Sequence, residues 1–413
     1  MKEQISFIHA ADLHLDSPFQ GLAHTPEHIF SDLQASTFTA LKKLVQAAIE
    51  KQVDFVLLVG DLFDNEKQSL KAQIRLRRAF EDLEQHQIPV YISYGNHDYL
   101  NGNKYAVTYP SNVFIFQDEQ VNYFTYKRNG KAIANIYGFS YKNRAVETNK
   151  AKEYYVQDEQ IPYHISMLHG SLHSNTEHDV YAPFYLSDLV NKDFDYWALG
   201  HIHKREILKE NPYIIYPGNI QGRNRKEQGE KGCYHVRMSP TNTTASFIPL
   251  QAIQFNEVSL DVSNCEEVYH LENEIKKKLG AELDPSISQL VQLKLTSNNR
   301  LLKQWETEQY LDDLIELINE TLAHQKPWMY IFRYTAVVHA SLFSDEMLYR
   351  AEHFMGELIR HFDKVSVHSF TKELFEHRQA RKYLDCLSTE DEKRIKEKAK
   401  QLLMNELMMN EGE

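Results

Sequence analysis

The stretch Val53-Asp-Phe-Val-Leu-Leu-Val-Gly-Asp-Leu-Phe-Asp64 joins an apolar run directly to a polar cluster. A short run of β-branched, leucine and aromatic side chains that ends at a glycine predicts a buried strand. Similar runs lie on either side, at 5–10 and 89–94, and the stretches between them, 31–52 and 67–87, have the apolar spacing of helices. This opening therefore predicts a β-α-β-α-β pattern with a parallel sheet.

The rest of the chain continues this alternation in two further parts. Short apolar runs with brief connections indicate a second, mixed sheet, with strands at 121–126, 132–139, 164–168, 196–199, 213–216 and 233–238. The composition shifts near Leu250, and beyond it the pattern predicts alternating strands and helices at 257–262, 266–279, 290–295, 301–322, 329–338 and 344–361. We therefore expect an α/β protein with a first domain over 1–250, a small α+β domain over 251–370 and a charged helical tail over 371–413.

Length and composition limit the class of protein. A chain of 413 residues leaves room for two or three domains. No stretch approaches the roughly 20 apolar residues that span a bilayer, and the start has no signal-peptide pattern, so we expect a cytoplasmic protein without membrane contact. Cys233, Cys265 and Cys386 match neither a disulfide framework nor a thiolate metal site. The net charge of −12 argues against holding nucleic acid by bulk electrostatics, unless metal ions supply positive charge locally.

Polar clusters follow the predicted strands at five places. They are Asp12-Leu-His14, Gly60-Asp-Leu-Phe-Asp64, Gly95-Asn-His-Asp98, His169-Gly170 and Gly200-His-Ile-His203. The carboxyl ends of strands in an open α/β sheet meet at one crevice, so these clusters can converge. Each alone is weak, because a lone histidine is more often a hydrogen-bonded structural residue. Together they offer carboxylate, amide and imidazole donors suited to manganese, iron or zinc.

The set resembles the calcineurin-like metallophosphoesterase superfamily. Its opening Ala11-Asp-Leu-His-Leu15 and its second domain are similar to the SbcD branch of DNA repair exonucleases, particularly the YhaO type. The resemblance implies a four-layer α-β-β-α sandwich with the second domain as a cap. It also implies two divalent ions, with Mn²⁺ expected and Fe²⁺ or Zn²⁺ as alternatives. One would be held by Asp12, His14, Asp61 and His203 and the other by Asp61, Asn96, His169 and His201.

The chemistry expected at such a site needs few further residues. Two ions ~4 Å apart lower the pKa of a shared water and clamp the phosphate. His97 is the candidate general acid for the leaving oxygen, and the family pattern pairs it with a carboxylate at Asp64 that would orient the ring. Arg223 and Arg225 are candidate phosphate contacts, but the pattern fits equally well a solvated loop that contacts no substrate. Tyr99 is a candidate for base stacking, with ordinary packing as the alternative.

Three functions remain open at this point. The leading hypothesis is a metal-dependent DNA exonuclease or endonuclease in DNA repair. The resemblance implies an SbcC-like coiled-coil ATPase as its partner, and a homodimer is also expected. A phosphoesterase acting on small molecules or cyclic nucleotides would use the same dinuclear site, and a non-catalytic scaffold would use it structurally. The tail from Lys372 onward is expected to bind the ATPase partner.

Overall fold

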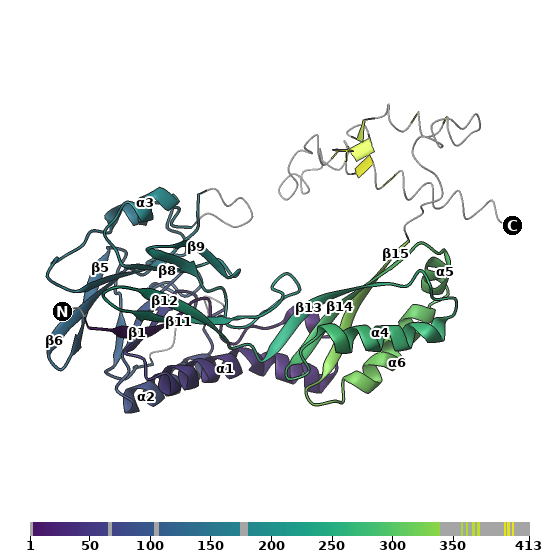
Figure 1. The fold of residues 1–413 in the computed structure, drawn as a ribbon, viewed down its shortest axis with the longest axis horizontal. Helices are drawn as coiled ribbons and strands as arrows, with labels where there is room; N and C mark the ends of the chain where they lie inside the picture. Colours follow the sequence, from purple (N-terminus) through teal and green to yellow (C-terminus); the bar gives the residue numbers. More distant parts are fainter. Residues whose placement is uncertain are drawn as a thin grey trace. The chain divides into compact units, whose positions relative to one another are not determined.

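The structure is a computed structural model that describes residues 3–64, 68–102, 107–173 and 181–338, with isolated positions between 357 and 399 (Figure 1). By internal contacts the chain divides into two compact units. The first comprises Met1–Leu260, Glu272–Lys294 and Asp312–Thr335, and the second comprises Asp261–Leu271, Leu295–Leu311 and Ala336–Glu413. This division does not follow the boundary expected near residue 250. The three-domain division stays a prediction, and the tail lies almost wholly outside the described residues.

The first sheet has the strand order β12-β11-β1-β2-β3-β4. Its strands are β1 (Ile5–Ala10), β2 (Phe55–Val59), β3 (Val90–Ser93), β4 (Val113–Ile115), β11 (Gly232–Met238) and β12 (Thr243–Pro249). Strands β1 to β4 are parallel to one another, whereas β11 and β12 pair antiparallel. The connections are α1 (Glu27–Glu50) and α2 (Leu70–Gln85), which confirms the predicted β-α-β-α-β opening.

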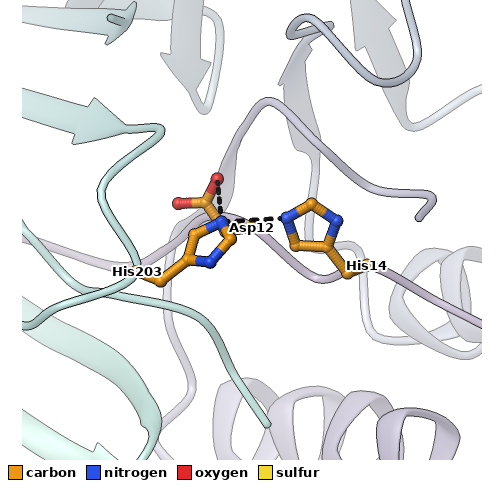
Figure 2. A group of neighbouring side chains, drawn as sticks. All are labelled: Asp12, His14 and His203. Carbon is orange, nitrogen blue, oxygen red and sulfur yellow. Dashed lines mark hydrogen bonds and ion pairs between the residues drawn. The ribbon is translucent and has the colours of Figure 1, made fainter. Parts of the chain in front are cut away.

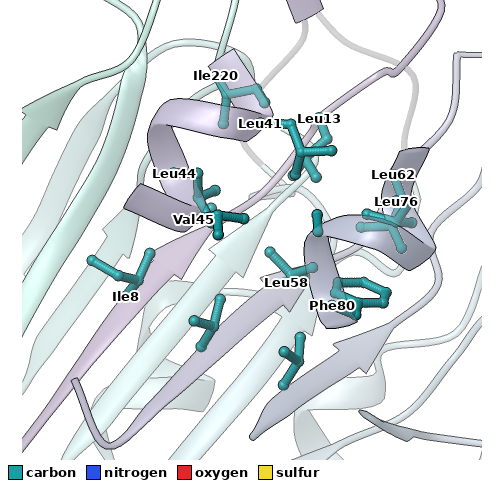
Figure 3. Packing of buried hydrophobic residues seen from close by; sticks show 14 of the residues in the cluster. Ile8, Leu13, Leu41, Leu44, Val45, Leu58, Leu62, Leu76, Phe80 and Ile220 are labelled. Carbon is teal, nitrogen blue, oxygen red and sulfur yellow. The ribbon is translucent and has the colours of Figure 1, made fainter. Parts of the chain in front are cut away.

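Helices α1 and α2 bury one face of this sheet (Figure 3). Leu41 and Leu44 of α1 and Leu76 and Phe80 of α2 are buried together with Leu58 of β2. Their spacing puts each pair on one face of its helix. Each such side chain contributes about 1.5–3 kcal/mol when it is removed from water. Packing against the helices therefore fixes the positions of the strands and of the loops at their ends.

The second sheet has the order β5-β6-β7-β8-β10-β9. Its strands are β5 (Asn122–Arg128), β6 (Lys131–Gly138), β7 (Tyr163–His169), β8 (Tyr196–Gly200), β9 (Glu206–Glu210) and β10 (Tyr213–Tyr216). Strands β6, β7, β8 and β10 run parallel, and β5 and β9 pair antiparallel at the edges, so the sheet is mixed as predicted. The edge strands β4, β9 and β12 were not predicted from the sequence.

The two sheets pack face to face and have helical segments on both outer sides. Aromatic rings fill the space between the sheets, with Phe7 stacked on Phe55 at 5.0 Å and in edge contact with Tyr196 at 5.2 Å. Short segments, η2 (Lys150–Glu153) and α3 (Leu186–Val190), cover the second sheet. In Figure 1, α3 lies on the opposite side of the sheets from α1 and α2. This arrangement confirms the four-layer α-β-β-α sandwich.

The segment beyond residue 250 forms a three-stranded sheet in the order β13-β14-β15. Its elements are β13 (Ile253–Asp261), α4 (Val268–Glu282), β14 (Ser288–Ser297), α5 (Leu301–Thr307), α6 (Tyr310–Leu322) and β15 (Met329–Val338). The helix predicted over 301–322 is broken into α5 and α6, because Gln309 has a left-handed backbone with φ 65°. The helix predicted over 344–361 lies outside the described residues, apart from two positions.

The start of α1 is buried against this small sheet, within the first compact unit. Ile29 and Leu33 pack with Phe255 of β13 near the short helix η1 (Gln20–Leu22). The Trp328 indole nitrogen donates to Asp32 Oδ2 at 2.8 Å. These contacts explain why parts of β13, β14 and β15 belong to the same unit as the sandwich.

The predictions about membrane spans and cysteines can be compared with the structure. None of the helices in the described ranges is both long and apolar enough to cross a membrane. Cys233 and Cys265 are buried and unbridged, as expected of reduced cysteines, whereas Cys386 lies outside the described residues. The cytoplasmic location stays a prediction.

Candidate metal centre

The candidate metal centre lies where strands of both sheets end. Its segments follow β1, β2 and β3 of the first sheet and lie at or after the ends of β7 and β8 of the second. Contacts between a backbone group of one set and a side chain of the other join the two sets of segments. His169 Nδ1 lies 3.0 Å from the carbonyl oxygen of Val59, and the amide of His201 donates to Asp12 Oδ2 at 3.0 Å. The structure thus brings together the five polar clusters that the sequence places at strand ends.

Asp12, His14 and His203 form the first group of candidate ligands (Figure 2). One ligand atom of each lies within 4.8 Å of the others, and the Nε2 atoms of His14 and His203 are 3.1 Å apart. Asp12 and His14 are fully buried. Two imidazole nitrogens that face each other beside a buried carboxylate are a donor set that fits a divalent ion such as Mn²⁺, Fe²⁺ or Zn²⁺.

Asp61, His169 and His201 form the second group. Asp61 Oδ2 lies 3.5 Å from His169 Nε2, and the amide oxygen of Asn96 lies 3.1 Å from the same nitrogen and 3.3 Å from His201 Nδ1. Asp61 Oδ2 is also 3.9 Å from His14 Nε2 of the first group. Asp61 therefore lies between the two groups, in the position that a bridging carboxylate would need.

Burial and mutual charge interactions shift the pKa values of several side chains in this cluster. Burial raises the pKa of the Asp12 carboxyl and lowers that of the His14 imidazole well below its usual range. Burial also opposes charge on Asp61 and His169, but their mutual attraction outweighs it. The pKa of Asp61 consequently lies well below its usual value, and that of His169 rises to about 9. A cation bound here would take the place of the proton on His169.

Several candidate ligands have a strained backbone. Asp12, His14, Asp61 and His201 have φ values of 52°, 41°, 52° and 97°, in the left-handed region that side chains rarely adopt. Such conformations cost of order 1–3 kcal/mol each and persist where the surroundings enforce them. The surroundings are closely packed, because a Cβ atom added at Gly95 would clash with Asp61 Oδ1. Strain concentrated at these positions points to function rather than to folding alone.

Asp98 ties two of the ligand-bearing loops together. Its Oδ2 accepts from the amide of Leu62 at 2.6 Å, and its Oδ1 accepts from the amide of Gly95 at 2.7 Å. Burial, aided by the charge of Asp61, raises the pKa of Asp98 to about 7. Asp98 belongs to the Gly95-Asn-His-Asp98 cluster, but no role was predicted for it. Its position directly after Asn96 and His97 was the available signal.

His97 lies beside the cluster, and its ring contacts the backbone of Asp64. Its amide donates to Asp61 Oδ1 at 2.9 Å, and a ligand atom of the ring lies within 4.8 Å of those of His14 and Asp61. Nδ1 lies 2.7 Å from the backbone carbonyl oxygen of Asp64. The expected pairing with the Asp64 carboxylate stays a prediction. That carboxylate accepts a hydrogen bond from the Arg223 guanidinium.

The three candidate substrate contacts lie in different surroundings. Arg223 packs against the metal centre, where its charge is taken up by Asp64 and, at 3.6 Å, by Glu227. Arg225 is exposed and lines a cavity of about 650 Å³ that also reaches Asp64 and Arg223. Tyr99 is partly buried against the aromatic cluster on the outer face of the second sheet. This position agrees with ordinary packing, the alternative to base stacking.

Sequence reasoning missed one further residue of the centre, Glu227. It is buried, and its Oε1 lies 2.9 Å from His203 Nδ1. Burial opposes charge on Glu227, but hydrogen bonding to His203 and the charge of Arg223 lower its pKa to about 2. Nothing in the charged loop Arg223-Asn-Arg-Lys-Glu227 distinguishes it from a solvated acid.

Comparison with known proteins gives a consistent set of matches. Residues 5–205, which include every candidate ligand, match the profile of the calcineurin-like phosphoesterases. The uncharacterized metallophosphoesterase YhaO of Bacillus subtilis is 37% identical over 98% of this chain and 99% of its own length. The DNA double-strand break repair protein Mre11 of Methanocaldococcus jannaschii is 26% identical over 62% of this chain and 69% of its own. Mre11 of Nanoarchaeum equitans is 25% identical over 66% and 75%.

Proposed function

Because the chain belongs to the calcineurin-like phosphoesterase family, we propose that it is a two-metal phosphodiesterase whose substrate is DNA. The observation that carries the proposal is the meeting of two buried ligand groups at Asp61, whose Oδ2 lies 3.9 Å from His14 Nε2 and 3.5 Å from His169 Nε2. One ion would be held by Asp12, His14, Asp61 and His203, and the other by Asp61, Asn96, His169 and His201.

Two bound ions would supply an activated water and a clamp for the phosphate oxygens. What remains for the protein is protonation of the leaving oxygen, and His97 is the residue placed for it. Its Nδ1 donates to the carbonyl of Asp64 at 2.7 Å, so in the imidazolium form Nε2 is the nitrogen left to carry the transferable proton, and proton transfer leaves the neutral ring. The carbonyl orients the ring, and Asp64 thus takes part through its backbone, while its carboxylate holds Arg223.

The surroundings of Asp64 support a nucleic acid as substrate. The cavity of about 650 Å³ beside Asp64 is lined by Arg225 and by Phe332 and Arg333 of β15. Within the described part of the chain, neither Arg225 nor Arg333 has an acidic side chain as an ion-pair partner. Free guanidinium groups suit phosphates on either side of the one that is cleaved, and an aromatic face suits a base. Local positive charge of this kind offsets the overall charge of −12.

The names of the more distant relatives point in the same direction. The Mre11 proteins that match this chain are described as DNA double-strand break repair proteins. A role in DNA repair in the cytoplasm follows as part of the proposal. The SbcC-like ATPase and a second copy of this chain stay proposed partners that rest on family resemblance. The tail assigned to the ATPase lies outside the described residues, so that assignment rests on the sequence alone.

A small-molecule or cyclic-nucleotide phosphoesterase is the second candidate. The overall charge of −12 favours it, because a long polyanion is repelled by an acidic surface whereas a small phosphodiester needs only the metal centre. The dinuclear arrangement serves both substrate classes equally. The cavity walls, rather than the ligands, are therefore where the two hypotheses differ.

The test compares substrates on the purified full-length chain with Mn²⁺. We expect single- or double-stranded DNA to be cleaved with a higher kcat/KM than bis(p-nitrophenyl) phosphate or cyclic nucleotides. Arg225→Ala and Arg333→Ala should each lower kcat/KM for DNA several-fold and reduce the salt dependence of DNA binding by about one phosphate contact. Neither should affect bis(p-nitrophenyl) phosphate.

Lys226→Ala is the matched control, because Lys226 lies in the same loop but does not line the cavity. It should leave DNA cleavage unchanged. A preference for cyclic nucleotides, with equal effects of the arginine variants on all substrates, would select the second candidate.

A further inference from the structure

Glu227 is a buried carboxylate in the loop between β10 and β11, with only 9% of its surface exposed. Its Oε1 lies 2.9 Å from His203 Nδ1. Its Oε2 accepts from the side-chain amide of the buried Asn219 at 2.7 Å and from the backbone amide of Arg223 at 2.7 Å. Both oxygens of Glu227 are thus engaged by groups that lie next to the candidate metal centre.

We propose that Glu227 is a positioning residue that holds His203 in the one tautomer able to bind a cation. The inference rests on the proposed two-metal function and deepens it. A carboxylate can only accept hydrogen bonds, so its contact with His203 requires the ring proton to be on Nδ1. Nε2 then carries the lone pair, and Nε2 is the atom that lies 3.1 Å from His14 Nε2 and 3.9 Å from Asp12 Oδ1 (Figure 2).

Arg223 makes the tautomer of His203 dependent on this carboxylate. Its Nη2 lies 3.2 Å from the same Nδ1 and could donate a hydrogen bond to it only if Nδ1 carried no proton. The proton would then be on Nε2, where it would block binding of a cation. Glu227 is closer, at 2.9 Å, and also attracts the Arg223 guanidinium at 3.6 Å. The Glu227 carboxylate therefore favours the Nδ1-protonated tautomer of His203, which can bind a metal ion, over the Nε2-protonated tautomer, which cannot.

A purely structural role for Glu227 predicts something different. Its bonds to Asn219 and to the Arg223 amide would close the loop whichever tautomer His203 adopts. Loss of those bonds would loosen the loop and lower stability without selecting one ion. A positioning role instead concerns the ion that His203 would hold, and leaves the group of Asp61, His169 and His201 intact.

The test is Glu227→Gln in the full-length chain, titrated with Mn²⁺ by calorimetry and checked by metal analysis. The amide oxygen of glutamine can satisfy Asn219 and the Arg223 amide only if its NH₂ turns toward His203. That NH₂ would donate to Nδ1 and move the ring proton to Nε2. We expect a 10- to 100-fold weaker affinity for one of two ions, the usual effect of losing such an outer partner, and an unchanged affinity for the other.

Glu230→Gln is the matched control, because Glu230 lies in the same loop but is exposed and, among the described residues, pairs with Arg205 alone at 3.5 Å. It should bind both ions as the wild type does. Nitrogen-15 histidine spectra of the metal-free proteins give a second readout. We expect the His203 proton on Nδ1 in the wild type and on Nε2 in Glu227→Gln. Glu227→Asp, which keeps an acceptor-only side chain, should retain the Nδ1 proton even if Glu227→Gln does not fold.

Unchanged affinity for both ions in Glu227→Gln would overturn the inference, as would equal weakening of both ions together with a lower Tm. An Nε2 proton on His203 in the wild type or in Glu227→Asp would also contradict it. A wild-type chain that binds no Mn²⁺ would instead refute the proposed two-metal function, so the two failures are distinguishable.

Discussion

Replacing His97 by alanine separates proton transfer from metal binding within a single motif. The substitution removes the ring and its 2.7 Å contact with the carbonyl of Asp64, but it keeps the backbone amide that donates to Asp61 Oδ1 at 2.9 Å. The loop that carries Asn96 should therefore stay in place. We expect His97→Ala to bind two ions and to bind DNA, while kcat for DNA falls roughly 10²- to 10⁴-fold, or ~3 to 5 kcal/mol in activation free energy.

The assay compares two leaving groups on the same variant. The alkoxide that leaves from DNA must be protonated, whereas p-nitrophenolate departs readily as an anion. Thymidine 5′-phosphate p-nitrophenyl ester should therefore be hydrolysed by His97→Ala with a much smaller defect than DNA. His86→Ala is a control, because the exposed His86 makes a similar Nδ1 contact, 3.0 Å from the carbonyl of Asp82, at the end of α2. That variant should cleave both substrates normally.

Two results would refute this reasoning. Equal defects of His97→Ala on both substrates would mean that the ring acts on the phosphate or on the strand rather than on the leaving oxygen. Loss of an ion would make His97 a ligand, a role that its position within 4.8 Å of ligand atoms of His14 and Asp61 would allow.

Three further predictions test the metals and the tail. Chelation should abolish hydrolysis, and Mn²⁺ should restore it better than Mg²⁺, because imidazole ligands favour a softer ion; full activity in EDTA would contradict the mechanism. Asp61→Asn should lower the occupancy of both ions in metal analysis, since its carboxylate lies between the two groups, and two tightly bound ions in that variant would argue against a bridge. Deletion from Lys372 onward should leave cleavage of short single strands nearly intact and abolish pull-down of the ATPase partner; unfolding of the truncated chain would show that the segment is part of the core.

The strands that the sequence predicted are mainly those buried on both faces. Phe55-Val-Leu-Leu-Val59 is continuously apolar because this strand, β2, lies between α1 and the second sheet. The three strands it did not predict, β4, β9 and β12, are edge strands whose residues are only partly buried or exposed. A half-exposed edge leaves no periodic apolar pattern to read.

The convergence of the polar clusters was predicted from the sequence, because each cluster lies at or after a strand end. The tertiary structure decided that these ends belong to two sheets, β1, β2 and β3 in the first and β7 and β8 in the second. The partners of those side chains were decided only by the tertiary structure. His97 contacts the backbone carbonyl of a residue 33 positions earlier, and His203 contacts Glu227, 24 positions later, in a charged loop that the sequence does not distinguish from a solvated one. The periodicity of buried residues depends on neighbouring positions in the chain. The contacts of Arg223 and His203 with the carboxylates of Asp64 and Glu227 depend instead on distances that exist only after the loops have packed together.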